Sequence, residues 1–195
     1  LSTRSDFASL LIELGTLDVT DAWKGAASVW TNTGNIREHP EQCFSGIKAG
    51  LEAGGPHAIA VAQEVDEIFR EKMPPILIPV ELIELCFSVY EKNSGNNKPQ
   101  LFGFHEWLNA TSQRNPEAAL AVTEIYLAYV DSVQPYFYDD ENQLVQLVTR
   151  LFSEAEEREA SDDGTMLGRV VAVQDSLLSL GINSIDDWLK AAERQ

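Results

Sequence analysis

The chain has 195 residues, and its apolar content of 44% is ordinary for a globular protein, which excludes wholesale disorder. The formal net charge is −17, from 31 acidic against 14 basic residues. Because such a chain repels phosphate groups, nucleic acids and anionic membranes are poor partners, whereas basic proteins, cations and cationic peptides remain open; the alternative is that the charge only keeps the surface soluble. No run of 18 apolar residues is present, so no transmembrane helix is expected.

Helical periodicity dominates the N-terminal part of the sequence. Apolar spacing predicts helices over 7–14, from about 18 to 33, over 40–53 and over 56–68. Gly34 is predicted to break the second of these helices. The third and fourth are predicted to open with proline, because proline has no N–H to lose at a first helical position and its φ already suits a helix.

A further proline, Pro79, is predicted to open a helix that is apolar on most faces and therefore buried. The apolar run 76–78 before it is flanked by prolines, which cannot donate to a β-ladder, so we expect an extended linker there. The polar segment 93–100 is the expected flexible point of the chain. Phe102 and Phe104 beyond it are expected to insert into the core.

In the C-terminal part, Asn115-Pro116-Glu117 combines a cap, a first-turn proline and an acid that matches the helix dipole. It predicts a long helix. Two further apolar stripes predict helices over 144–155 and 166–180, and a capping box predicts a last short helix after them.

The pattern amounts to about ten helices and no convincing sheet. We therefore predict an all-α fold, built of antiparallel helix hairpins as an α-solenoid-like or an irregular helical domain. A single domain is expected over 1–195. Because the first residue is Leu1, we expect it to be a C-terminal segment of a longer, multidomain cytoplasmic protein.

One stretch resembles the tetratricopeptide repeat. In this stretch the first helix carries the tryptophan, the pair of small residues and the aromatic residue of the repeat, and a glycine falls near the turn. The second helix carries a small, a large and a small residue in that order, and a proline ends the unit. These residues are Trp23, Ala26, Ala27 and Trp30; Gly34; Cys43, Ile47 and Gly50; and Pro56. The match requires about three extra residues between the helices, and HEAT-like pairing fits about as well. The resemblance implies a helical-repeat protein that binds other proteins.

Signatures of catalysis are missing from the sequence. It contains no P-loop, no dinucleotide-binding fingerprint and no nucleophile elbow. The segment 139–142 resembles an aspartate-rich diphosphate motif, but Gln143 stands where a second carboxylate is needed. Cys43 and Cys86 are interpreted as small buried side chains. The histidines lack metal-site spacing and are interpreted as structural or exposed: His39, His57 and His105. We predict no catalytic residue, no metal and no cofactor.

Two adjacent features predict a partner-binding surface. One is a cluster of aromatic residues in a connection between helices, since rigid aromatic side chains make good interface anchors. The other is the stretch 139–163, whose nine acids and two arginines suit a basic partner. The alternatives are that the aromatics cover the core and that the acids form a solvated helix face. The residues predicted to bind a partner are Tyr136, Phe137, Tyr138, Asp139, Asp140, Glu154 and Glu157.

The leading hypothesis is a non-catalytic interaction, scaffold or sensor domain that binds a protein partner or the upstream part of its own chain. A structural oligomerisation module is the first alternative. An all-helical hydrolase or lyase that uses acidic residues and a divalent metal is the second.

Overall fold

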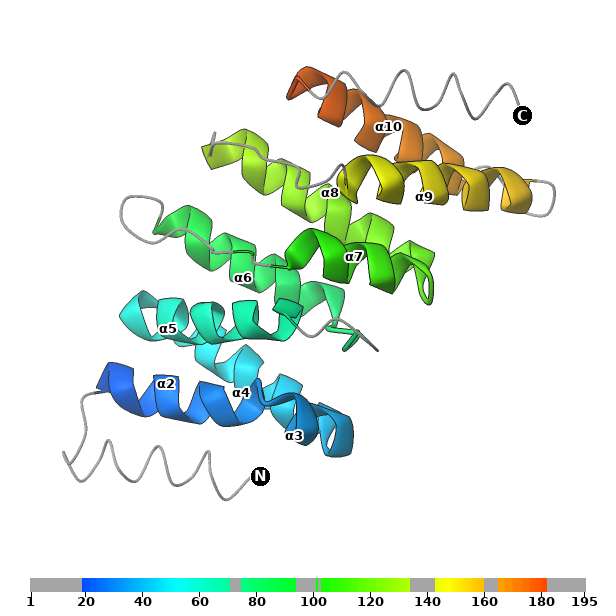
Figure 1. Ribbon diagram of the computed structural model, residues 1–195. Helices are drawn as coiled ribbons and strands as arrows, with labels where there is room; N and C mark the ends of the chain where they lie inside the picture. The colour runs from blue at the N-terminus through cyan, green and yellow to red at the C-terminus, as the bar shows by residue number, and fades with distance from the viewer. Residues whose placement is uncertain are drawn as a thin grey trace. The chain divides into compact units, whose positions relative to one another are not determined.

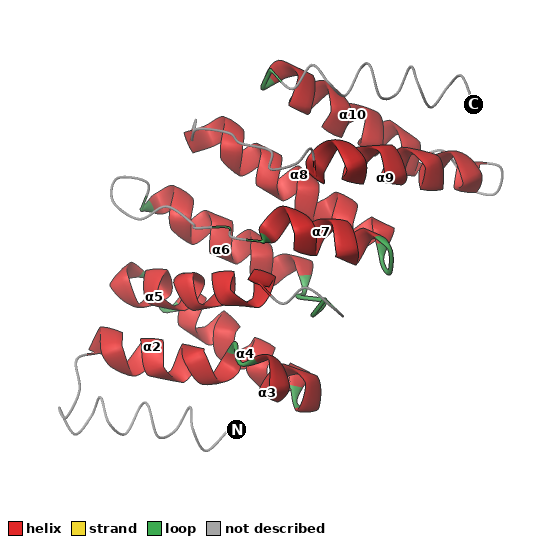
Figure 2. Cartoon of the chain, in the orientation of Figure 1, coloured by secondary structure: helices red, strands yellow, loops and turns green. Residues whose placement is uncertain are grey.

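The computed structural model describes the chain in six stretches: residues 19–70, 75–93, 101, 103–133, 143–159 and 165–181 (Figure 1). Within these residues the regular structure consists of nine α-helices and one 3-10 helix, with no strand (Figure 2). The predicted all-α class is confirmed. No helix in this part of the chain has the length and apolar character needed to cross a membrane. The chain divides into two compact units, Leu1–Phe104 and His105–Gln195.

The first unit is built from helices that pack in a regular order. Its elements are α2 (Val19–Trp30), α3 (Thr33–Glu38), α4 (Pro40–Glu52), α5 (Gly55–Asp66), η1 (Glu67–Arg70) and α6 (Val80–Lys92). Helix α2 packs against α5, its neighbour in Figure 1, and α4 packs against both of them and against α6. If α2 and α4 form one pair and α5 and α6 the next, the first helices of the two pairs pack on each other, and so do the second helices. This order is the one expected of stacked helix pairs.

Close packing of α4 depends on two glycines spaced one turn apart. A Cβ atom at Gly46 would lie 2.6 Å from Cδ2 of Trp30 on α2, and one at Gly50 would lie 2.7 Å from Cγ2 of Val61 on α5. Trp30 and Val61 are both buried. The missing side chains therefore let α4 approach two helices at distances that no other residue allows.

The predicted break at Gly34 is wrong. Helix α2 ends at Trp30, and Gly34 lies inside the short helix α3. The break occurs earlier because Asn32 adopts an extended conformation and its side chain accepts a hydrogen bond from the N–H of Asn35 at 3.2 Å.

The segment before α6 is irregular, and its last residue has an extended conformation. Residues 75–79 form no regular element, with Ile76 and Ile78 buried and Leu77 44% exposed. Pro79 is the N-cap of α6, with φ −54° and ψ 134°. The predicted helix over 56–68 ends at Asp66, and its last turn continues as the 3-10 helix η1.

Phe104 belongs to the core, as predicted, whereas Phe102 lies outside the described residues. The ring of Phe104 meets those of Phe69 and Phe87 edge-on, with centroids 5.0 and 5.9 Å apart. The approach depends on Gly103, whose φ is +77°, because a Cβ there would lie 2.8 Å from the carbonyl oxygen of Phe69.

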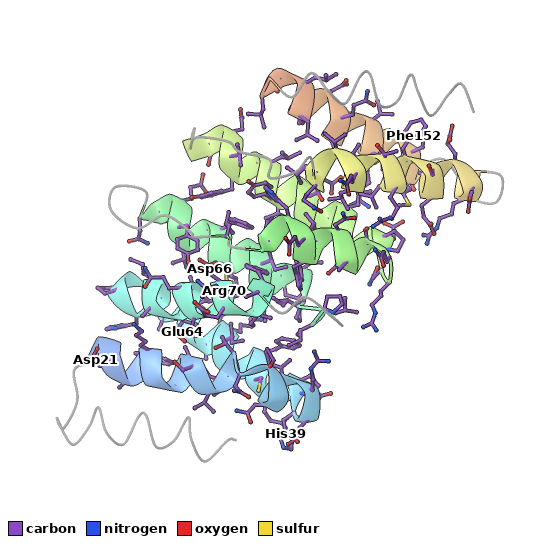
Figure 3. The ribbon with its side chains drawn as sticks, viewed as in Figure 1. Asp21, His39, Glu64, Asp66, Arg70 and Phe152 are labelled. Atoms are coloured by element: carbon purple, nitrogen blue, oxygen red, sulfur yellow. The ribbon has the colours of Figure 1, made fainter. Side chains whose placement is uncertain are left out.

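One polar link is buried in the first unit. The hydroxyl group of Tyr90 on α6 donates a hydrogen bond to Oδ2 of Asp66 at 3.1 Å, and both side chains are buried (Figure 3 labels Asp66 at the end of α5). A buried carboxylate requires such donors, so the pair fixes the register between α5 and α6.

The second unit contains four helices. They are α7, which begins at the unit boundary (Phe104–Ser112), α8 (Pro116–Val133), α9 (Gln143–Glu159) and α10 (Thr165–Ser179). Helix α10 packs against both α8 and α9. The predicted N-cap of α8 is confirmed, since Oδ1 of Asn115 accepts a hydrogen bond from the N–H of Ala118 at 3.1 Å.

Candidate interaction surface

The structure describes two of the seven residues predicted to bind a partner. Tyr136, Phe137, Tyr138, Asp139 and Asp140 lie outside the described residues. Glu154 and Glu157 lie on α9, the helix on which Figure 3 labels Phe152. The site can therefore be built only from α9 and the helices packed around it.

The C-terminal end of α9 is unusually acidic. Its last six residues contain four glutamates and one arginine, Arg158. Carboxylates at a helix C-terminus face the negative end of the helix dipole and lower the stability of the helix. Glu154 is compensated, because Nη2 of Arg158 lies 3.3 Å from its Oε1. Glu156 and Glu157 are exposed and have no counter-ion in the part of the chain that the structure describes.

A chain of charges ties α9 to its neighbours. Arg158 also reaches Glu117 on α8, with 3.7 Å between Nη1 and Oε1. Nη1 of Arg169 on α10 lies 3.1 Å from Oε2 of the same Glu117. Arg169 also donates two hydrogen bonds to Glu124, from Nε to Oε1 at 2.9 Å and from Nη2 to Oε2 at 2.7 Å. The hydrogen bonds with Glu124 raise the pKa of Arg169, although burial opposes the rise. This network fixes the positions of Glu117 and Glu124 on α8 and of Glu154 on α9.

A second polar cluster joins α7 and α9. Asn109 donates from Nδ2 to Oε1 of Gln143 at 3.0 Å and accepts from Nη1 of Arg150 at its carbonyl oxygen, at 2.9 Å. The same Nη1 lies 3.0 Å from Oγ of Ser112. Arg150 thus caps carbonyl and hydroxyl groups in the last turn of α7, where the helix dipole favours a cation.

Sequence reasoning missed this α7–α9 cluster. Asn109 and Arg150 stand 41 residues apart, and no motif connects them. The ion pair between Glu154 and Arg158 was accessible, however, because a Glu four residues before an Arg on one helix is a recognised stabilising spacing.

The structure places both cysteines and two of the three histidines as follows. Both cysteines are buried, as predicted, and burial raises the pKa of each thiol, which disfavours the reactive thiolate. His105 packs edge-on against Tyr126 and shares a hydrogen bond of 3.2 Å with its hydroxyl group. His39 is exposed between α3 and α4. Among the described residues, no group of three or more His, Cys, Asp or Glu side chains is placed to hold a metal ion.

The fold and these surfaces define an all-helical protein whose helices pack against one another in pairs. Comparison with protein-family models, with curated proteins and with solved structures finds no match to this chain. The resemblance to the tetratricopeptide repeat therefore stays a prediction.

Proposed function

We propose that this chain is a non-catalytic interaction or scaffold module that binds a basic protein segment, on a partner or on another part of its own parent protein. The observation that supports the proposal most strongly is the acidic C-terminal end of α9. Glu156 and Glu157 occupy the helix end where carboxylates are least stable, and no described cation compensates them. A basic ligand at this position would offset the repulsion between these carboxylates and the negative end of the helix dipole.

The ion pairs around α9 support the proposal in a second way. Arg158 and Arg169 hold Glu117 and Glu124 on α8 and Glu154 on α9, so these carboxylates beside the site have fixed positions. A preordered charged surface loses less side-chain entropy on binding than a flexible one. Complementary charge also speeds association and makes it sensitive to salt.

The test compares two variants that remove the same charge. The partner is isolated by cross-linking in the cells that make the protein, then purified and titrated against the wild-type chain, Glu156→Gln/Glu157→Gln, and Glu81→Gln/Glu84→Gln. The second pair is exposed near the start of α6. We expect the Kd to rise roughly tenfold for the α9 pair, the loss of about 1.4 kcal/mol of binding free energy, and to change little for the α6 pair. Equal changes in Kd for the two pairs would refute a site on α9.

An oligomerisation module is the second candidate, and an exposed patch on α10 favours it. Val171 is 40% exposed and lies among the exposed small residues Gly168 and Ala172. Small side chains let two helices approach closely, so this face leaves room for a helix of a second copy of the chain. Concentration-independent dimerisation that is lost in Val171→Glu would favour this candidate.

A further inference from the structure

Among the residues that the structure describes, the guanidinium group of Arg150 is held through one nitrogen atom, Nη1. Its Nη1 donates to the carbonyl oxygen of Asn109 at 2.9 Å and to Oγ of Ser112 at 3.0 Å, and it also contacts Oδ1 of Asn109. All of these acceptors are neutral. Because they belong to the last turn of α7, they fix the plane of the guanidinium group without neutralising its charge.

The opposite edge, formed by Nε and Nη2, donates to no acceptor in the described part of the chain. In Arg169, the corresponding Nε–Nη2 edge binds a carboxylate. Nε and Nη2 of Arg169 bind the two oxygens of Glu124 at 2.9 and 2.7 Å, the side-on geometry that suits a carboxylate. Arg150 therefore presents, already oriented, the pair of donors with which this protein binds a carboxylate elsewhere.

No described carboxylate of the chain satisfies this edge. Glu154 lies four residues further along α9, on the same side of the helix as Arg150, but it is paired with Arg158 at 3.3 Å. The side chain of Arg150 is half-buried, whereas Arg114, a few residues after α7, is exposed. A half-buried cation with no carboxylate partner among the described residues stands out in a chain of net charge −17.

We propose that the Nε–Nη2 edge of Arg150 is a binding site for a carboxylate group of a bound protein segment. The inference deepens the proposed function, because it adds an acidic anchor beside the basic stretch expected to contact the end of α9. A partner with both features docks in one register, since a reversed segment places its acid against Glu156 and Glu157.

The experiment is a titration of the ¹⁵N-labelled wild-type chain, monitored at the arginine Nε–H resonances. The probes are N-acetylglycine, which carries a chain-terminal carboxylate, and N-acetylaspartate amide, which carries a side-chain carboxylate. Sodium chloride keeps the ionic strength constant. Arg150→Lys identifies the resonance of interest by its loss, and Arg114→Lys identifies that of an exposed arginine. Should Arg150→Lys fail to fold, nuclear Overhauser contacts between Nε–H and α7 supply the assignment.

We expect the Arg150 Nε–H resonance to move downfield with one or both carboxylates, and to move further than that of Arg114. The probe that gives the larger shift identifies the source of the carboxylate. A shift no larger than that of Arg114, or an equal shift with chloride alone, would overturn the proposal. Because the titration needs no partner, its failure leaves the proposed function of the α9 surface intact.

Discussion

Substitution by alanine is expected to stabilise the fold at Gly25 on α2 and to destabilise it at Gly46 on α4. Gly25 lies in the interior of α2, and a Cβ added there would have nothing within 4 Å, so Gly25→Ala gains helix propensity and stabilises the fold by about 0.5–1 kcal/mol. Gly46→Ala gains the same propensity but places its Cβ 2.6 Å from Cδ2 and 2.7 Å from Nε1 of Trp30. Ordinary contacts begin near 3.4 Å, and Trp30 is only 2% exposed, so the ring has little room to move.

Overpacking of this kind costs about 1–3 kcal/mol, and three close ring atoms place Gly46→Ala at the upper end. After the gain in propensity, a net loss of about 2 kcal/mol is expected. Urea unfolding followed by circular dichroism measures both variants, and the smaller side chain in Trp30→Leu should reduce the cost of Gly46→Ala in a double-mutant cycle. Equal stabilisation by Gly25→Ala and Gly46→Ala would refute the packing of α4 on α2.

Three further outcomes are expected. Arg169→Met lowers the free energy of unfolding by about 1 kcal/mol, a modest value because Arg169 is 38% exposed, and the loss shrinks in 1 M salt in the same urea assay. Glu156→Gln/Glu157→Gln raises the stability of the fold by about 0.3–1 kcal/mol, since it removes charge from the negative end of the α9 dipole; a lower melting temperature would contradict this. In the folded protein, burial and then the charge of Asp66 raise the pKa of the Cys86 thiol above its ordinary value of 9.0. The contribution of this thiol to the free energy of unfolding is therefore complete below pH 9. Above pH 9 it declines by at most about 1.4 kcal/mol per pH unit. Cys86→Ala should flatten the decline in stability between about pH 9 and 10.5.

The helices were predictable where local chemistry decides them. Pro40 begins α4 and Asn115 caps α8, as the sequence indicates, because both effects act within one turn. The prediction at Gly34 was wrong, although it too rested on a local signal. A glycine near a helix end is a common terminator, but here the stronger Asn32 cap begins a new helix two residues earlier.

The candidate site was less accessible to sequence reasoning. The acidic stretch was visible, and Glu157 is exposed as a binding residue must be. The sequence did not show that Glu154 is paired with Arg158, although the spacing permits it, nor that Arg150 caps a helix 41 residues away. The contact of Arg150 with α7 depends on which helices become neighbours, and that follows from long-range packing rather than from any one segment.

The most direct test of the central claim is the mass of the purified chain in solution, measured by light scattering after size exclusion, alone and with its cross-linked partner. A module that binds other proteins elutes as a 21.6-kDa monomer and forms a stoichiometric complex with that partner, which dissociates as salt is raised. A homodimer of twice that mass at every concentration, with no complex formed, would contradict the account and favour the oligomerisation module.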